Sequence, residues 1–412
     1  MDGRDRDGLQ TGPIRAGLIR KSEEPMPTGC TRRKFLTDCG RCALLTAALT
    51  PFTRPLAGSH AAAQELRKGY LEKKLSPYFT ALESGSIRCE LCPHGCEVAP
   101  GERGRCEVRE NIDGRYYSLV YGNPCAVHVD PIEKKPFFHL LPATQSFSLA
   151  TAGCNLDCKF CQNWEISQAR PEQTLNYALS PDQVVQLARR YQCPSIASTY
   201  VEPTIFFEYL LDIARAARAA GLLKVMHSNG FINEAPLREL CRFLDAACID
   251  LKAFNDGTYR ELTGGRLQPV LDTLTRLKSL GVHTEIVNLV VPGKNDDLKE
   301  ITAMSRWIRE HLGADTPLHF TRFYPRYQLK SLPPTPIETL ERARAAAMGE
   351  GLHYVYVGNV PDHPGQHTIC PGCRQVVIRR VGYQVDPSHL KDGRCDRCGQ
   401  AIAGRWHSAG TG

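Results

Sequence analysis

The sequence predicts an α/β protein whose core is an open or partial (β/α) barrel. Between residues 145 and 358, short apolar runs alternate with amphipathic segments of helical spacing. Repeated strand–helix units with helical crossovers imply a parallel sheet. Cysteine groups flank this region on both sides, which predicts an N-terminal Cys-rich module and a C-terminal zinc ribbon.

Composition indicates a globular protein without a nucleic-acid groove. The 412 residues suffice for a large core plus smaller modules. A hydrophobic content of 42% and a charged content of 23% are ordinary for soluble proteins. The formal charge of +7 is modest for this length, and Lys and Arg are scattered rather than banded.

The first 63 residues are predicted to be a leader. Residues 31–36 (TRRKFL) resemble a twin-arginine export motif through Arg32 and Arg33, and the apolar stretch at 42–52 is too short to span a bilayer. A small-residue cleavage candidate follows at 61–63 (AAA), and Met26 is a candidate start. We therefore expect export through the twin-arginine pathway and no stable membrane span. The alternative is a chance arginine pair on a cytoplasmic protein.

The segment after the leader is predicted to combine a helix with a metal knuckle. Residues 64–84 have leucines at helical spacing, which favours a short entry helix. Four thiols then follow within a few residues, and Gly101 and Gly104 permit tight turns around an ion; they belong to Cys89, Cys92, Cys96 and Cys106. Zinc, a second iron–sulfur cluster and, in an exported protein, disulfides all remain open.

The core elements follow one another in strict alternation. The first predicted helix starts after Ser180, a residue type that caps helices, and its Val184, Val185 and Ala188 recur at helical spacing. Strands are predicted at 146–151, 195–201, 223–228, 247–251, 283–291, 318–323 and 353–357, and helices at 181–191, 204–220, 236–244, 268–280, 298–311 and 337–350. Barrels carry their chemistry at the carboxyl ends of the strands, where the first strand here runs into a cysteine loop.

That loop contains three thiols and no obvious fourth. Cys154, Cys158 and Cys161 follow the spacing C-x3-C-x2-C. Structural zinc sites and most iron–sulfur sites use four protein ligands. A cubane cluster held by three cysteines keeps one iron open for a ligand that is not protein. The alternative is a zinc loop that takes a distant fourth ligand.

The tail carries two further cysteine pairs, separated by strand-like sequence at 376–380. Their members are Cys370, Cys373, Cys395 and Cys398. This spacing predicts a structural zinc ribbon. The expected divisions are therefore a leader at 1–63, an N-terminal four-cysteine module and connection at 64–125, the barrel at 126–360 and the ribbon at 361–412.

From residue 89 to residue 406 the chain resembles radical S-adenosylmethionine (radical SAM) enzymes of the AmmeMemoRadiSam system, which are relatives of the pyruvate formate-lyase activating enzymes. The matching stretches lie at 89–96 (CELCPHGC), 130–136 (DPIEKKP), 154–168 (CNLDCKFCQNWEISQ), 200–204 (YVEPT), 227–230 (HSNG), 250–252 (DLK) and 288–293 (NLVVPG). The resemblance implies a radical SAM barrel, a 4Fe–4S cluster, S-adenosylmethionine, an electron donor such as flavodoxin or ferredoxin, and AMMECR1-like and Memo-like partner proteins. It implies no particular substrate.

The resemblance also assigns residues. It makes Cys154, Cys158 and Cys161 the cluster ligands and places Phe160 next to the adenine. The methionine amino group is held by backbone carbonyls and a carboxylate from Thr199, Tyr200, Val201 and Glu202, where many relatives have Gly-Gly. Ser228 and Asn229 match residues that face the ribose. Asp250, Lys252, Lys134 and Lys135 are further polar candidates, with a surface ion pair or a solvated face as the alternative.

These features predict an enzyme that reductively cleaves S-adenosylmethionine to a 5′-deoxyadenosyl radical, which removes hydrogen from an unknown substrate. The first alternative is an activating enzyme for a glycyl-radical enzyme, which needs such a partner. The second is a non-catalytic iron–sulfur or zinc scaffold, which the missing fourth cysteine argues against.

Overall fold

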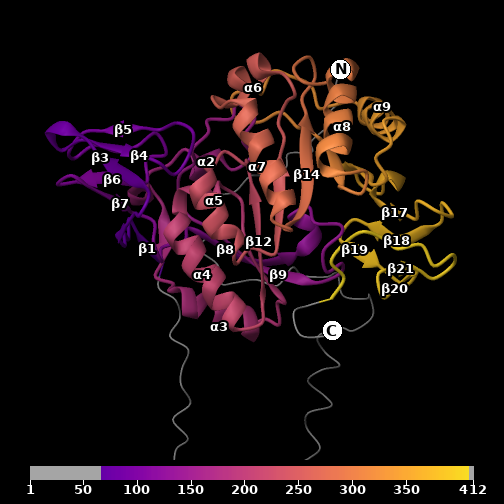
Figure 1. Ribbon diagram of the computed structural model, residues 1–412, viewed down its shortest axis with the longest axis horizontal. Coiled ribbons are helices and arrows are strands. Elements are labelled where there is room, and N and C mark those ends of the chain that lie inside the picture. The colour runs from indigo at the N-terminus through magenta and orange to yellow at the C-terminus, as the bar shows by residue number, and fades with distance from the viewer. Residues whose placement is uncertain (1–65, 408–412) are drawn as a thin grey trace, which may run out of the picture.

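The computed structural model describes residues 66–407, so the predicted leader at 1–63 lies outside the described residues. Its centre is one eight-stranded sheet (Figure 1). From edge to edge the strands are β16 (Val355–Gly358), β15 (Leu318–Arg322), β14 (His283–Val290), β13 (Ala246–Asp250), β12 (Leu223–Ser228), β11 (Ser195–Ser198), β9 (Gln145–Ala150) and β8 (Ala126–Pro131). All neighbours pair in parallel except β8 and β9. The α/β class and the mostly parallel sheet are thus confirmed.

Helices cover one face of the sheet, as the alternating pattern predicts (Figure 1). They are α3 (Pro181–Arg190), α4 (Phe207–Ala219), α5 (Glu234–Cys241), α7 (Leu267–Ser279), α8 (Leu298–Leu312) and α9 (Ile337–Gly349). Ser180 caps α3 as expected, because its Oγ accepts from the Gln183 N–H at 3.3 Å while the Gln183 side chain accepts from the Ser180 N–H. Within residues 66–407, no helix has the length and apolar character needed to cross a bilayer.

The other face of the sheet is filled by the chain that follows β8. Residues 132–141 place Ile132, Phe137 and Leu140 against Val225 and Cys248 of the inner strand faces. We call residues 132–141 the floor segment. The buried carboxylate of Glu285 fixes it, since the backbone N–H groups of Phe138 and His139 donate to Glu285 at 2.8–3.1 Å. The interior is therefore closed at this end. The opposite edge of the sheet, formed by the carboxyl ends of the strands, stays accessible, and we call it the rim.

Two core elements were not predicted from the sequence. Strand β8 adds an antiparallel edge, and α6 (Asp256–Thr263) lies between β13 and α7. Helix α6 is short, but Asn255 caps it through the Thr258 N–H at 3.0 Å and it ends at Gly264 in the left-handed conformation. Both elements matter for the site, because the loop that bears the three cysteines bonds to the end of α6 and β8 lines the interior below it.

The predicted helix at 64–84 is wrong. This segment instead forms β1 (Leu66–Lys68), β2 (Lys74–Leu75) and β3 (Phe79–Ala81). These strands pair with β10 (Leu175–Tyr177), β7 (Arg115–Ser118) and β4 (Ile87–Cys89), respectively. Gly69 adopts a positive φ of 69°, which breaks a helix. The leucine spacing was therefore overridden by tertiary strand pairing.

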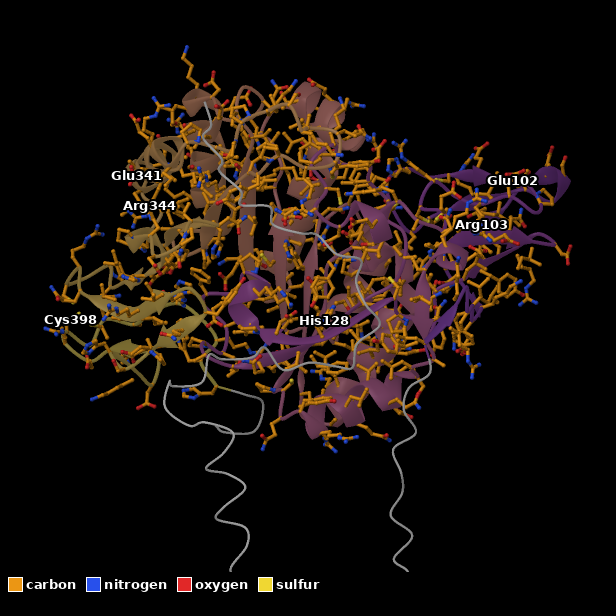
Figure 2. The ribbon with its side chains drawn as sticks, turned by 180° about the vertical axis from the view of Figure 1, so that it is seen from behind. Glu102, Arg103, His128, Glu341, Arg344 and Cys398 are labelled. Carbon is orange, nitrogen blue, oxygen red and sulfur yellow. The ribbon has the colours of Figure 1, made fainter. Side chains whose placement is uncertain are left out.

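The N-terminal cysteines lie in small antiparallel sheets on one side of the molecule. One sheet contains β3, β4 and β5 (Glu97–Val98), and the other β2, β7 and β6 (Arg109–Ile112). Buried Arg109 joins them to the core through a bidentate ion pair with Glu208 of α4, at 3.0 and 2.5 Å. In Figure 2, Glu102 and Arg103 mark this module at the side opposite to Cys398.

The C-terminal cysteines lie in short hairpins against the other side of the barrel (Figure 1). The strands are β17 (Thr368–Ile369), β18 (Val376–Val381), β19 (Gln384–Asp386), β20 (Leu390–Lys391) and β21 (Arg394–Cys395). This module packs on the floor segment: buried Arg380 donates to the Phe138 carbonyl at 2.7 Å and lies over its ring, 4.1 Å from the centroid. It therefore closes the lower end of the barrel.

Candidate active site

The three thiols of the central motif lie in the loop that follows β9, at the carboxyl end of the sheet. Gly153 turns the chain out of the strand with a φ of 90°, and a Cβ there would lie 2.5 Å from the Val108 side chain. The loop is then fixed to α6, because the Asp157 and Lys159 N–H groups donate to the carbonyls of Thr263 and Leu262 at 3.1 and 2.9 Å. The thiols are thus presented on a rigid loop.

The surroundings of these thiols suit a metal cluster. Cys158 is buried, and burial raises its pKa to about 12, so without metal it is a neutral thiol. The Leu156 N–H points at Cys154 Sγ at 3.4 Å, and Ser167 Oγ lies 3.2 Å from Cys161 Sγ. Such donors stabilise sulfur ligands once metal has displaced their protons. The residues present therefore fit a three-thiolate cluster.

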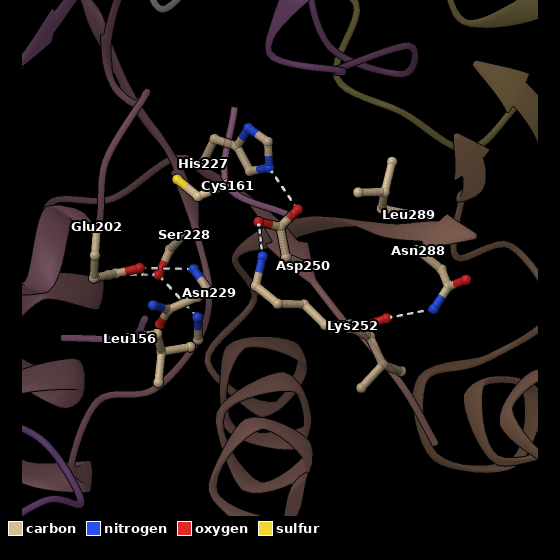
Figure 3. Close-up of polar contacts among 12 residues, drawn as sticks. Leu156, Cys161, Glu202, His227, Ser228, Asn229, Asp250, Lys252, Asn288 and Leu289 are labelled. Carbon is tan, nitrogen blue, oxygen red and sulfur yellow. Dashed lines mark hydrogen bonds and ion pairs between the residues drawn. The ribbon is translucent and has the colours of Figure 1, made fainter. Parts of the chain in front are cut away.

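Glu202 lies beside the cysteine loop with both carboxylate oxygens engaged (Figure 3). It is 2% exposed, and burial raises its pKa. Oε1 accepts from Thr204 N at 2.9 Å and Ser228 Oγ at 2.8 Å, and Oε2 accepts from Asn229 N at 2.7 Å. The Asn229 side chain in turn donates to Asn155 of the cysteine loop at 2.8 Å. One network thus joins three of the strand ends.

The backbone at Tyr200 adopts a conformation that is unusual for its bulky side chain. Tyr200 has a φ of 67°, the left-handed conformation that glycine adopts most easily. Its hydroxyl donates to Asp130, its ring lies 4.7 Å from Lys135 Nζ, and its carbonyl accepts from Asn163 at 2.7 Å. The contacts below the rim hold a bulky residue in the conformation that a glycine would supply.

A second polar group lines the same rim. His227 Nε2 lies 2.8 Å from Asp250 Oδ1, and Lys252 Nζ lies 2.9 Å from Asp250 Oδ2 (Figure 3). Burial opposes ionisation of Asp250, but Lys252 and His227 outweigh it and hold the pKa of the carboxyl well below its usual range. Lys252 also lies 5.5 Å from the centre of the Phe160 ring. These charges are oriented toward the ring and the thiol loop rather than spread on the surface.

The structure brings most of the sequence-predicted residues to one rim. Cys154, Cys158, Cys161, Phe160, Glu202, Ser228 and Asn229 lie on adjoining strand ends, with Thr199 and Val201 in the turn that contains Tyr200. Lys135 lies lower: it is 1% exposed and its Nζ is 2.5 Å from Asp130 Oδ2, so it is no solvated face. Lys134 remains 45% exposed and bonds to the other oxygen of Asp130 at 2.8 Å.

Several residues of the site were missed from the sequence. His227 precedes the predicted Ser228 and Asn229, yet it faces Asp250 on the neighbouring strand. Its signal is the alternation along a strand, since Val225 and His227 share the inner face. His128 and Asp130 share one face of β8: the exposed His128 ring lies edge-on to the Tyr200 ring at 5.6 Å, and buried Asp130 accepts from the Tyr200 hydroxyl. They were missed because β8 itself was not predicted.

Comparison with known proteins decides the family. The model of the Radical SAM superfamily matches residues 148–304, which include the thiol loop, Glu202 and Asp250. The chain is a member of the radical SAM superfamily. An uncharacterized protein of Methanocaldococcus jannaschii, MJ0808, is 44% identical over 79% of this chain and 97% of its own length. The likeness of this radical SAM chain to that relative therefore extends beyond the residues that the superfamily model matches.

More distant relatives cover less of the chain. The benzylsuccinate synthase activating enzyme of Thauera aromatica is 22% identical over 37% of this chain and 50% of its own length. The pyruvate formate-lyase-activating enzyme of Clostridium pasteurianum is 20% identical over 38% of this chain and 66% of its own. A radical SAM methyltransferase from Sphaerobacter thermophilus superposes with a TM-score of 0.42 at 14% identity, over 72% of this chain and 80% of its own.

Proposed function

We propose that this chain reductively cleaves S-adenosylmethionine at a 4Fe–4S cluster bound by Cys154, Cys158 and Cys161. The single observation that carries the proposal is a triad of thiols on a rigid loop at the strand ends, with no fourth thiol in its motif, in a chain of the radical SAM superfamily. When bound, the cluster supplies one electron to the sulfonium, and the resulting 5′-deoxyadenosyl radical removes hydrogen from a substrate.

The residues of the rim are proposed to orient S-adenosylmethionine. Glu202 offers a carboxylate and the Tyr200 turn offers carbonyls for the methionine amino group, while Phe160 lies against the adenine. Ser228 and Asn229 already donate to Glu202, so we propose that they act on the ribose from positions fixed by that network. Holding the substrate by several groups fixes the sulfur near the cluster before any electron moves.

The interior below the rim is proposed to bind the substrate. His128, Asp130, Lys135, His227 and Asp250 give it both signs of charge, and the floor segment closes it at the far end. An interior that is closed at its far end also limits the access of water and stray hydrogen donors to a radical. This polar lining favours a charged or strongly hydrogen-bonding substrate over an apolar one.

The remaining assignments concern metal and partners. We propose that Cys370, Cys373, Cys395 and Cys398 bind structural zinc. We also propose a flavodoxin or ferredoxin as electron donor, AMMECR1-like and Memo-like proteins as partners, and export through the twin-arginine pathway. Activation of a glycyl-radical enzyme is a second candidate, which the two activating enzymes among the relatives favour.

The products of the reaction test this proposal. Anaerobically reconstituted protein, reduced with dithionite and given S-adenosylmethionine, should form 5′-deoxyadenosine and methionine in equal amounts. S-adenosylhomocysteine as the main product would instead indicate methyl transfer and would contradict hydrogen abstraction. For the second candidate, a glycyl radical should appear in an added glycyl-radical enzyme by electron paramagnetic resonance (EPR).

A further inference from the structure

The four N-terminal thiols surround one cavity between the N-terminal module and the barrel. Asn155, Thr204 and Ile205 line it on the barrel side, and all four thiols line it on the other, namely those of Cys89, Cys92, Cys96 and Cys106. Four thiols that converge on one space indicate a metal site.

The C-terminal thiols provide a comparison within the same chain. Cys370 Sγ lies 3.6 Å from Cys398 Sγ, and Cys373 Sγ lies 3.7 Å from Cys395 Sγ. A tetrahedral zinc ion with zinc–sulfur bonds of about 2.3 Å requires sulfur–sulfur distances of roughly 3.8 Å. All four sulfurs also lie within 4.8 Å of one another. The C-terminal site therefore has the dimensions of a zinc site before any metal binds.

The N-terminal thiols have different dimensions. Among residues 66–407, the C-terminal four form the one group of potential metal ligands whose atoms all lie within 4.8 Å, so neither the N-terminal four nor the triad reaches that spacing. In a cubane cluster each cysteine binds its own iron, so the sulfurs are separated by an iron–iron edge and two iron–sulfur bonds. Thiols that are spaced more widely than the C-terminal four suit a cubane better than a single zinc ion.

The framework around the cavity is already fixed. The Cys89 N–H donates to the Cys96 carbonyl at 2.9 Å, and the Gly104 N–H donates to the Arg109 carbonyl at 3.0 Å. A larger residue than glycine is excluded at position 104, because a Cβ would lie 2.5 Å from the Tyr116 hydroxyl. The backbone that bears the thiols is thus fixed by hydrogen bonds and close packing.

This cavity adjoins the triad loop. His94 Nε2 lies 2.7 Å from the Asn155 carbonyl, and Arg105 forms an ion pair with Asp157 at 3.0 Å. Asn155 and Asp157 both lie between Cys154 and Cys158 in the loop. The N-terminal site is therefore connected directly to the loop that bears the triad.

We infer that Cys89, Cys92, Cys96 and Cys106 bind a second 4Fe–4S cluster, which passes electrons to the triad site. Four thiolates close this cluster, so it has no open iron and does not bind S-adenosylmethionine. It accepts one electron from a low-potential donor protein and gives one electron to the triad cluster, with no bond formed or broken. The site itself is independent of the proposed function, whereas its role as electron carrier rests on it.

Metal content of the full chain tests the site. Wild-type protein isolated without oxygen and reconstituted with iron and sulfide should hold about eight iron atoms, four at each thiol site, and zinc at the ribbon. A Cys154→Ala/Cys158→Ala/Cys161→Ala variant leaves the N-terminal module intact. It should keep about four iron atoms and a reducible 4Fe–4S spectrum that S-adenosylmethionine does not change.

The opposite results are equally clear. If the triad variant contains no iron and two zinc ions per chain instead of one, the N-terminal site is a zinc site and the inference is wrong. If the four N-terminal thiols bind no metal and are instead oxidised to disulfides, the inference is also wrong. A Cys96→Ser variant should lose iron from the N-terminal site in the triad background. Cys241→Ser, which changes a cysteine outside the cavity, should lose none.

Discussion

At the scale of single residues, Glu202 connects the strand ends of the site. Its four hydrogen-bond donors come from Thr204, Ser228 and the Asn229 backbone, and Asn229 passes the connection on to the cysteine loop. A carboxylate that accepts this many bonds stays in one position although it is buried. We therefore place the recognition of S-adenosylmethionine on this residue more than on its neighbours.

Glu202→Gln tests that assignment. The amide loses the negative charge and turns an NH₂ group toward a donor, and hydrogen bonds to charged groups contribute about 1.5–3 kcal/mol each. We expect the dissociation constant of S-adenosylmethionine to rise about tenfold or more, measured by equilibrium dialysis on reconstituted protein. Glu350→Gln, at an ion pair on the outer helices, should leave it unchanged. Unchanged affinity in Glu202→Gln with full cluster content would contradict the assignment.

The triad could be proposed from the sequence because its three cysteines lie within one short loop. Their spacing is local, so no knowledge of the fold is needed. Ser228 and Asn229 were predicted with a direct role, but the structure shows that both first serve Glu202. His227 and the conformation of Tyr200 depend on neighbouring strands and on Asp130, which a single sequence does not reveal.

At the scale of elements, the floor segment decides whether the barrel interior is closed. Glu285 of β14 is fully buried and accepts from two backbone N–H groups of the segment and from His319 at 2.8 Å. Burial opposes its ionisation, but hydrogen bonds from His283 and His319 outweigh burial and hold the pKa of Glu285 well below its usual range. The floor is thus attached to the sheet by one charged residue.

Glu285→Gln should lower the free energy of unfolding by about 3 kcal/mol, because an amide cannot accept on both sides. A depressed carboxyl pKa stabilises the folded state above the unfolded pKa of about 4.3, and this stability is lost as pH falls through the folded pKa. The difference between wild type and variant should therefore shrink on acidification, as followed by urea unfolding at several pH values. A constant difference from about pH 7 to about pH 3 would contradict this reasoning.

The C-terminal cysteine module packs against the floor segment through Arg380. Changing Cys370 and Cys373 to Ser should remove the proposed zinc and leave iron unchanged, because the proposed iron sites lie on other elements. Loss of the metal should also weaken the packing of Arg380 on Phe138, so we expect a lower melting temperature. Elemental analysis and thermal unfolding measure both effects. Loss of iron in place of zinc would show that the ribbon holds a cluster.

Core strands and helices were largely predictable, because each buries a complete face with a clear period. The antiparallel β8 and the short α6 were not, since neither has a long periodic run. The wrongly predicted helix at 64–84 shows that helical spacing alone does not decide the structure of a short segment. Its leucines have helical spacing, but its strands gain more from pairing with β4, β7 and β10.

At the scale of the whole molecule, the two outer cysteine modules lie on opposite sides of the barrel (Figures 1 and 2). The N-terminal module adjoins the thiol loop through His94 and Arg105. The ribbon adjoins the floor through Arg380. The N-terminal module, which we propose carries electrons, therefore lies apart from the C-terminal module, which supports the floor segment.

Location is a property of the whole molecule and concerns residues outside the described part. If Arg32 and Arg33 form a working twin-arginine signal, the protein should be exported in folded form and cut near Ala63. Changing both residues to Lys keeps the charge but alters the recognised side chains, so export should stop. Fractionation of tagged protein measures this. Wild type and the double-lysine variant both found uncut in the cytoplasm would show that the leader is inactive.

Formation of 5′-deoxyadenosine by site-specific variants shows whether the triad holds the catalytic cluster. Reduced wild-type protein should convert S-adenosylmethionine to 5′-deoxyadenosine, and the Cys154→Ala/Cys158→Ala/Cys161→Ala variant should form none, although it keeps its ribbon zinc and native secondary structure. Cys241→Ser should retain wild-type activity. Continued formation of 5′-deoxyadenosine by the triple variant would show that the triad is not the catalytic cluster site.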